Sequence, residues 1–181
     1  MVPRIGCRLA SPSSRFDEPA LMMLLLFKVR DDRYGIDVKS IIEVMPSVPV
    51  QRIPKVPDYF AGLLNYRGGV VPVLDLSQLI DHCTSKPCLS TRIILVESPG
   101  EQHPPLGLLA EGATETIKVA ADDFSHTSIG VEGEAFVDGM IMNETGMIRL
   151  VNLDNLLTPE VREFLFNAPA LATTEGAEHG V

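Results

Sequence analysis

Arg67 is the residue of this chain whose type is least expected where it stands. It lies in the stretch GLLNYRGGVVPVLDL (62–76), on a predicted turn between two apolar runs, in a chain with a net charge of −9. The glycines that follow, Gly68 and Gly69, favour a tight hairpin because glycine reaches positive φ without a Cβ clash. Arginine contributes nothing to such a turn, so Arg67 is either a solvated loop charge or a binding residue. Its planar guanidinium donates up to about five hydrogen bonds to a carboxylate, an amide or a backbone carbonyl.

Catalytic and metal-binding patterns are weak elsewhere in the chain. The segment HCTSKPC (82–88) brings a histidine near two cysteines, but it lacks the C-x2-C spacing of a zinc site and needs a further ligand from His103 or His126. Ser125 precedes His126, yet adjacent side chains rarely face each other productively, and the chain has no G-x-S-x-G sequence. No glycine-rich stretch has the spacing of a phosphate-binding loop. The sequence therefore predicts no metal, no cofactor and no enzyme activity.

The composition excludes two further classes of protein. The chain has 181 residues, 45% of them hydrophobic and none of them tryptophan, which allows one good aliphatic core or two small ones. Its acidity argues against a protein that follows a nucleic-acid backbone, since such a protein needs a basic face. The apolar run 21–27 is too short to span a bilayer and Lys28 follows it directly, so it predicts a buried strand. The three cysteines fit a reducing compartment, and we expect a cytoplasmic protein that does not insert into a membrane.

Short β-strands dominate the predicted secondary structure. Prolines at positions 46, 49, 54, 57 and 72 suit edges, bulges and barrel corners better than a flat central sheet. Short strands at this regular spacing indicate small β-barrels. The expected helices are short and lie at 76–80, 153–157 and 159–166. The expected strands are 24–29, 34–38, 40–45, 48–53, 60–66, 69–76, 92–97, 106–111, 113–119, 135–142 and 146–151.

The folded part is expected between two tails. Residues 1–22 are rich in Pro, Ser and Arg without an apolar period, which predicts a disordered tail. Residues 167–181 predict a second, flexible tail. The ordered domain is therefore expected to span residues 23–166.

The predicted strands fall into two similar halves. Residues 34–45 align with 106–117 after a shift of 72 positions, and residues 62–79 align with 139–156 after a shift of 77. Such similarity implies two like subdomains, each too small to be stable alone, with repeat cores at about 34–80 and 106–157. The aligned pairs include Gly35 with Gly107, Glu43 with Glu115, Gly62 with Gly139, Gly69 with Gly146, and Asp75 with Asn152.

The two halves differ most informatively at the predicted turn. Arg67 of the first half aligns with Glu144 of the second, and Tyr66 aligns with Asn143. A residue that only shapes a turn has less reason to reverse its charge between two copies. Whatever Arg67 does is therefore done by one half only.

The first half also carries a long family pattern. Residues 34–45 read YGIDVKSIIEVM and residues 53–76 read IPKVPDYFAGLLNYRGGVVPVLDL. These stretches resemble the CheW family, the scaffold proteins of bacterial chemosensory arrays. That family shows aromatic-Gly/Ala-Ile-x-x-x-x-Val-x-Glu-Val/Ile, followed by Pro-x-Tyr/Phe-x-x-Gly-x-x-Asn-Leu-Arg-Gly-x-x-x-Pro-Val-x-Asp-Leu. The second half corresponds more loosely through LGLLAEGATETIKV and GMIRLVNLDNLL, and the resemblance covers residues 24–166.

The resemblance implies a mostly β fold of two five-stranded SH3-like barrels packed side by side, with short helices. It implies a non-catalytic adaptor that binds the regulatory domain of a CheA-type histidine kinase and the cytoplasmic hairpin tip of a chemoreceptor. Apolar side chains would line a groove between the barrels. The receptor-binding residues it implies are Arg67, Glu43, Ile41, Val44 and Asn65. The turn and barrel residues it implies are Gly35, Gly62, Gly68, Gly69, Pro72, Asp75, Gly107, Gly139 and Gly146.

Some residues depart from the family pattern. Tyr66 stands where the family usually has leucine, and Ala110-Glu111 stand where it commonly has Val-Asp. The combination of NYRG with LSTRIILV and EGATET is more similar to scaffolds of alternative chemosensory systems, such as the Wsp type that controls a diguanylate cyclase. Two other functions stay open: a stand-alone binding module and a metal hydrolase that uses residues 82–88. Co-purification with a histidine kinase favours the scaffold, and bound zinc favours the hydrolase.

Overall fold

The structure is a computed structural model that describes residues 21–98, 104–120, 123–124 and 136–167. Both predicted tails lie outside these residues, except that Leu21, Met22 and Asn167 belong to regular elements. Within the described ranges, no helix is long and apolar enough to cross a membrane. The elements are β1 (Leu21–Val29), β2 (Asp32–Asp37), the short 3-10 helix η1 (Val38–Ser40), β3 (Ile41–Pro46), β4 (Phe60–Tyr66), β5 (Gly69–Asp75), α1 (Leu76–Asp81), β6 (Arg92–Val96), β7 (Leu106–Ala120), β8 (Val137–Asn143), β9 (Gly146–Val151), α2 (Leu153–Leu156) and α3 (Pro159–Asn167).

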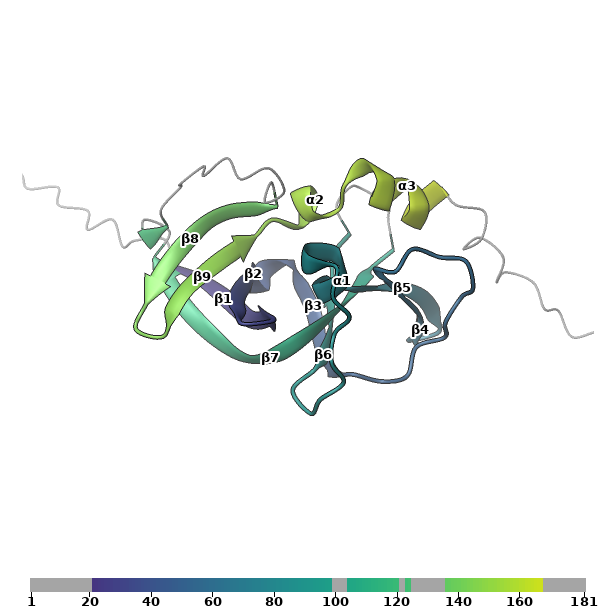
Figure 1. The fold of residues 1–181 in the computed structure, drawn as a ribbon, viewed down its shortest axis with the longest axis horizontal. Coiled ribbons are helices and arrows are strands. Elements are labelled where there is room, and N and C mark those ends of the chain that lie inside the picture. Colours follow the sequence, from purple (N-terminus) through teal and green to yellow (C-terminus); the bar gives the residue numbers. More distant parts are fainter. Residues whose placement is uncertain (1–20, 99–103, 121–122, 125–135, 168–181) are drawn as a thin grey trace, which may run out of the picture.

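The strands form two five-stranded barrels that share β7. In barrel A the strands pair in the order β7-β1-β2-β9-β8, and in barrel B they pair in the order β3-β6-β7-β5-β4. Each barrel has one parallel pair, β2 with β9 in barrel A and β5 with β7 in barrel B. Figure 1 shows the barrels side by side, with β7 running from one to the other. The predicted fold class is confirmed.

The two sequence repeats are interleaved between the barrels. Barrel A takes β1 and β2 from the first half of the chain, and barrel B takes the first part of β7 from the second half. The repeat cores at 34–80 and 106–157 therefore do not coincide with the barrels. The cause is the pairing itself: Tyr34 lies opposite Arg149 and Leu74 lies opposite Leu108, so strands of one half complete the sheet of the other.

A bend at Gly112 lets β7 serve both barrels. Gly112 has a φ of 62°, which residues with a Cβ rarely adopt. The pairing with β1 shifts its register at the same place, between Leu26 and Lys28. The separate strands expected at 106–111 and 113–119 are thus two arms of one strand of 15 residues.

The segment expected as a strand at 48–53 is not one. It makes a single bridge, in which Gln51 and Leu63 exchange two backbone hydrogen bonds of 2.8 Å. Pro49 and Pro54 flank this bridge and have no N–H to donate, so a longer ladder cannot form. The predicted helices are confirmed to within one residue at each end.

Three apolar cores hold the molecule together. One fills barrel A, around Leu24, Ile141 and Ile148, and one fills barrel B, around Val73 and Leu95. The largest lies between the barrels and gathers side chains from β1, β2, β6, β7 and the three α-helices. Since the interior of each barrel is small, the shared core is expected to be the main source of hydrophobic stabilisation.

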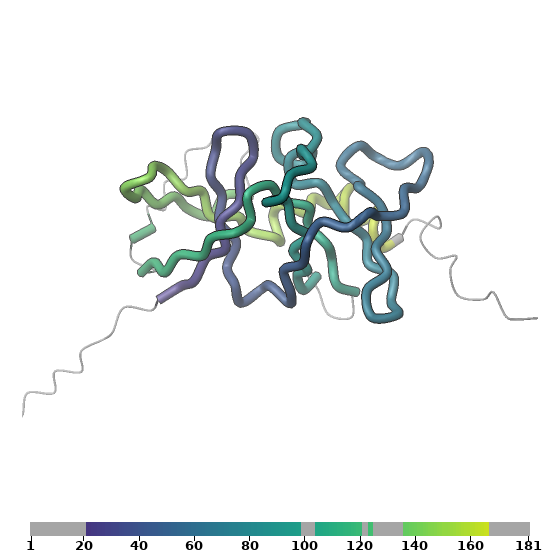
Figure 2. The backbone as a smooth tube through the Cα atoms, turned by 90° about the horizontal axis from the view of Figure 1, so that it is seen from below, coloured from purple at the N-terminus to yellow at the C-terminus, as the bar shows by residue number. Residues whose placement is uncertain are grey.

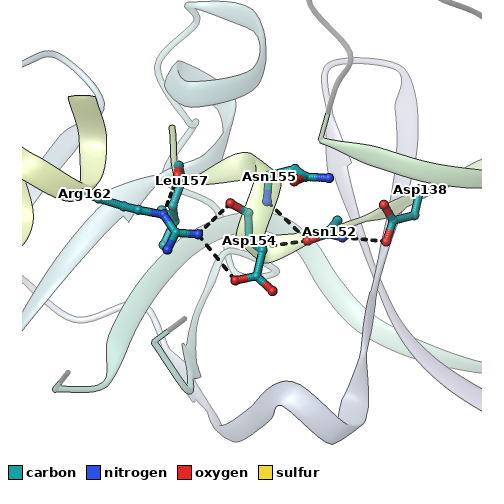
Figure 3. A network of polar contacts seen from close by, with 6 residues as sticks. All are labelled: Asp138, Asn152, Asp154, Asn155, Leu157 and Arg162. Carbon is teal, nitrogen blue, oxygen red and sulfur yellow. Dashed lines mark hydrogen bonds and ion pairs between the residues drawn. The ribbon is translucent and has the colours of Figure 1, made fainter. Parts of the chain in front are cut away.

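Helices α2 and α3 connect the end of barrel A to barrel B. The Arg162 guanidinium donates to the carbonyl oxygens of Leu157 at 2.9 Å and Asp154 at 2.8 Å, and these bonds join the two helices (Figure 3). From α3, the Phe164 ring meets the ring of Phe60 edge to face at 5.3 Å between centroids. Helix α3 therefore packs against the shared core and covers part of it.

Asp75 anchors the start of α1 and the loop that follows it. Its carboxylate accepts from the backbone N–H of Ser77 at 3.0 Å and of Gln78 at 3.4 Å, as a helix N-cap does. It also accepts from the backbone N–H of Ser85 at 2.9 Å and from its hydroxyl at 2.6 Å. Asp75 is buried, and so is Ser85. The carboxylate thus ties barrel B to the loop between α1 and β6.

Gly62 lies at a bulge of β4, where the backbone of another segment comes very close. The pairing with β5 shifts its register between Phe60 and Gly62, and Gly62 has a φ of 147°. A Cβ at this position would lie 2.6 Å from the carbonyl oxygen of Gln51. Gly139 occupies the matching register shift of β8, so both copies of the repeat use glycine here.

Candidate partner-binding site

The β4–β5 turn presents Arg67 to solvent. Tyr66 pairs with Gly69, which leaves Arg67 and Gly68 as a loop of two residues. Their φ values are 51° and 84°, which match the type I′ turn that suits the twist of a hairpin. A residue other than glycine costs about 1 kcal/mol in this left-handed conformation. Arginine is therefore a poor choice for the turn itself, and its side chain is 76% exposed.

Glu43, Tyr66 and Arg67 form a compact group that we call the Arg67 cluster. Oε2 of Glu43 accepts a hydrogen bond from the Tyr66 hydroxyl at 2.5 Å and another from Nη2 of Arg67 at 3.1 Å. The Arg67 guanidinium also lies over the Tyr66 ring, 4.9 Å from its centroid. Glu43 belongs to β3 and lies opposite Leu95 of β6, a member of the core of barrel B. The cluster therefore lies beside the core of barrel B.

The electrostatics of the Arg67 cluster are local. The hydrogen bond to Glu43 raises the pKa of the Tyr66 phenol, and partial burial adds to that effect. The Glu43 carboxylate is only half-buried, so its ion pair with Arg67 contributes little to the stability of the fold. The cluster is a positioned surface group rather than a structural ion pair.

The other predicted receptor-binding residues do not all face the same way. Asn65 is exposed next to the cluster on β4, and Val44 is exposed on β3 with 40% of its surface accessible. Ile41 instead packs against the core between the barrels. Glu43 lies opposite Leu95, whereas Val44 lies opposite Ile94, so their side chains point to opposite faces of β3. The structure brings Glu43 and Arg67 together, whereas Asn65 lies on the face of β4 opposite Tyr66, and Val44 and Ile41 are separated from the cluster.

Barrel A has a related arrangement at its own hairpin. Glu115, the repeat copy of Glu43, lies 3.8 Å from Nη2 of Arg33. Arg33 also donates to Oδ1 of Asn143 at 3.3 Å and to the Thr145 hydroxyl; Asn143 ends β8 and Thr145 lies in the β8–β9 turn. Figure 2 shows the two hairpins toward opposite ends of the molecule. In each barrel an arginine links a glutamate to the hairpin, but only in barrel B does the turn supply the arginine.

The predicted turn and barrel residues lie either at close approaches of the chain or at the two hairpin turns. A Cβ at Gly35 or Gly107 would come within 3.1 Å of a neighbouring side chain. Gly68 and Gly146 have positive φ at the two turns, and Gly69 begins β5. Pro72 is buried within β5.

The candidate metal segment is engaged in other contacts. Cys83 accepts a hydrogen bond from Arg30, and hydrogen bonds from Ser90 and Thr91 lower the pKa of the exposed Cys88 thiol. Among the described residues, no three histidine, cysteine or acidic side chains lie close enough to hold a metal ion. His103 and His126, the other ligands considered, lie outside the described residues.

Tyr66 is the functional candidate that sequence reasoning missed. Its departure from the usual leucine was visible in the sequence. The contact with Glu43 was not, because the two residues are 23 positions apart and on strands that do not pair. Only the closure of barrel B brings them together.

Comparison with known proteins gives a consistent result. The family model described as CheW-like domain matches residues 23–160. The chain is similar to "Chemotaxis protein CheW" from Rhizobium meliloti, with 28% identity over 142 residues that cover 77% of this chain and 90% of that protein. It is also similar to the protein of the same name from Bacillus subtilis, with 23% identity over 76% of this chain and 87% of the relative.

A solved structure agrees with these sequence matches. The crystal structure of the scaffolding protein TtCheW from Thermoanaerobacter tengcongensis superposes with a TM-score of 0.70 at 26% identity, covering 81% of this chain and 94% of that one. The comparisons favour neither the metal hydrolase nor the stand-alone module. A family model that matches most of the chain, together with the two-barrel fold, leads to one conclusion: the chain belongs to the CheW family of non-catalytic scaffold proteins.

Proposed function

We propose that this protein couples the cytoplasmic hairpin tip of a chemoreceptor to the regulatory domain of a CheA-type histidine kinase. Family membership supports the adaptor role, and so does the similarity to the Rhizobium protein named as a chemotaxis protein, of which this chain covers 90%. Its place of action is then the cytoplasmic side of a receptor array. Chemotaxis-like signalling is the process that it serves.

The Arg67 cluster is the observation that carries the receptor side of this proposal. Arg67 occupies a strained position of a rigid turn, where a glycine would fold with less strain. Its side chain is held by Glu43 and Tyr66, yet most of it is open to solvent. An exposed and oriented arginine suits a contact with another protein, since arginine is enriched among the residues that dominate interfaces.

Arg67→Ala is expected to weaken receptor binding about thirtyfold while leaving the melting temperature unchanged, because the arginine acts at the interface and not in the core. Arg67→Lys should restore only part of the affinity, since an ammonium cannot reproduce the planar fork of donors. Pull-down with receptor-containing membranes and thermal melts on the same samples measure both effects.

Arg52→Ala serves as the matched control. It removes the same charge from an exposed position in the loop between β3 and β4. If receptor binding falls equally in both variants, the loss in Arg67→Ala comes from the change in net charge and not from a contact made by Arg67. We propose that the kinase binds a face other than the Arg67 cluster, so kinase binding should survive in Arg67→Ala. A variant that unfolds, or one that keeps full receptor binding, contradicts the assignment of Arg67.

A further inference from the structure

Tyr66 makes two contacts that a leucine at this position cannot make. Its hydroxyl donates to Oε2 of Glu43 at 2.5 Å, and its ring lies under the Arg67 guanidinium at 4.9 Å. The rest of the side chain packs against the core of barrel B, which restricts its movement. Tyr66 therefore contacts both charged members of the cluster, and its own position is fixed by packing.

Arg67 keeps most of its hydrogen-bonding capacity. It pairs through Nη2 alone, and among the described residues that bond goes to Glu43. Since a guanidinium carries about five N–H groups, roughly four remain for a partner. The Arg67 guanidinium carbon lies over the Tyr66 ring, so a partner reaches the N–H groups that point away from the ring. Two parallel N–H groups suit the two oxygens of a carboxylate.

We infer that Tyr66 positions Arg67 for a bidentate pair with a carboxylate of the partner, and that it thereby selects for an acidic residue at the contact point. The inference rests on the proposed receptor-binding role of this site. Tyr66 is a positioning residue in this scheme, and Arg67 makes the contact.

Two physical effects support this role. An arginine already held in its binding geometry loses less side-chain entropy when a partner arrives. The Tyr66 hydroxyl also gives Glu43 a hydrogen bond that does not depend on Arg67, so the carboxylate keeps a partner when Arg67, held in place, shares its charge with a second anion. Asn143, the repeat copy of Tyr66, has no ring, and the β8–β9 turn carries no arginine. Among the described residues, the positioning of a turn arginine by a tyrosine is therefore found in barrel B and not in barrel A.

Binding of a soluble chemoreceptor hairpin-tip fragment from the same organism tests the inference. Tyr66→Phe removes only the hydroxyl and keeps the ring, and we expect it to weaken binding about fivefold. Tyr66→Leu removes both contacts, and we expect about a tenfold loss. Thermal melts on the same samples separate these effects from a loss of folding, and Tyr66→Phe covers the case in which Tyr66→Leu is poorly folded.

The selection for a carboxylate is tested on the receptor side. Each Asp and Glu of the tip is changed in turn to Asn or Gln, and each tip variant is measured against the unchanged scaffold and Arg67→Ala. At one of these positions, the change should weaken binding of the tip to the unchanged scaffold about tenfold, and it should not weaken binding to Arg67→Ala any further. A double-mutant cycle detects this coupling. The coupling should shrink in Tyr66→Phe.

A spectroscopic titration reports on the local geometry. The phenolate absorbance lost in Tyr66→Phe isolates this tyrosine from Tyr34 and Tyr59. Because the hydrogen bond to Glu43 raises the pKa of Tyr66, Glu43→Gln should move its ionisation to lower pH. A purely packing role for the ring would leave this ionisation unchanged.

The outcomes separate the inference from the function on which it rests. If the unchanged scaffold binds the tip, but Tyr66→Phe binds equally well or no single carboxylate matters, the inference is wrong and the receptor role stands. If the unchanged scaffold does not bind the tip at all, the proposed function fails and the inference fails with it.

Discussion

Asp75→Ala is expected to lower the free energy of unfolding by about 4 kcal/mol. The buried carboxylate accepts hydrogen bonds from Ser77, Gln78 and both donors of Ser85. Alanine leaves these donors without their acceptor beside the buried side chains of Ser77 and Ser85, and an unsatisfied buried donor is the costliest way to lose a hydrogen bond. Urea unfolding followed by circular dichroism measures the loss. Hydrogen exchange should become faster at the amides of these residues before it does so elsewhere.

The repeat provides a matched control for this substitution. Asn152 caps α2 as Asp75 caps α1, through the backbone N–H of Asp154 at 2.8 Å and of Asn155 at 3.2 Å. These bonds are exposed, and so is the further side-chain hydrogen bond that Asn152 donates to Asp138 of β8 at 2.7 Å (Figure 3). Asn152→Ala should therefore cost only about 1 kcal/mol, as an ordinary helix cap does. Equal losses in the two variants would show that the link from Asp75 to Ser85 contributes no stability.

Gly62→Ala is expected to lower the free energy of unfolding by about 4 kcal/mol, the sum of backbone strain and a clash. The added Cβ would lie 2.6 Å from the carbonyl oxygen of Gln51 and 2.9 Å from Cγ2 of Val50. The carbonyl cannot easily withdraw, since it accepts the hydrogen bond from Leu63 that closes barrel B. Denaturant midpoints measure the loss.

Gly68→Ala controls for the strain alone. Gly68 also has a positive φ, but a Cβ there would have no heavy atom within 4 Å. Its cost should stay near 1 kcal/mol, the ordinary cost of a left-handed residue with a side chain. If Gly62→Ala is as mild as this control, the close approach of the Gln51 carbonyl is not a constraint on the fold.

The sequence predicted the type of most elements because local signals decide them. Glycine and proline punctuation marked the strand ends, and residues 60–66 and 69–76 were predicted as strands to within one residue. It did not predict which strands pair. An internal repeat reports that two segments have the same shape, but it does not report whether a strand completes its own barrel or the other one. The prediction of a strand at 48–53 was wrong for a local reason. The alternation of apolar and polar residues there suited a strand, but the prolines did not allow one.

The sequence predicted those residues of the candidate site that stand out by their type or by their spacing. Arg67 stood out because its charge reverses between the repeats, and Glu43 followed from the family resemblance. Three-dimensional placement decided the rest. Ile41 and Val44 both lie opposite residues of the shared core, Val96 and Ile94, because of the register shift in β3. Only Ile41 packs against that core, whereas Val44 is exposed. Tyr66 joined the cluster only through contacts between strands that do not pair.

The interleaving of the repeats has a consequence for the order in which the protein is made. Barrel B has all its strands once the first arm of β7 has left the ribosome, since it needs nothing beyond about Ala110. The β1–β2 hairpin is synthesised first, yet its partner β9 is among the last strands to emerge. Domains generally fold as they are synthesised, from the N-terminus onward. Here the first hairpin must wait, with the apolar side chains of Leu24 and Leu26 incompletely packed, until β8 and β9 supply Ile141 and Ile148.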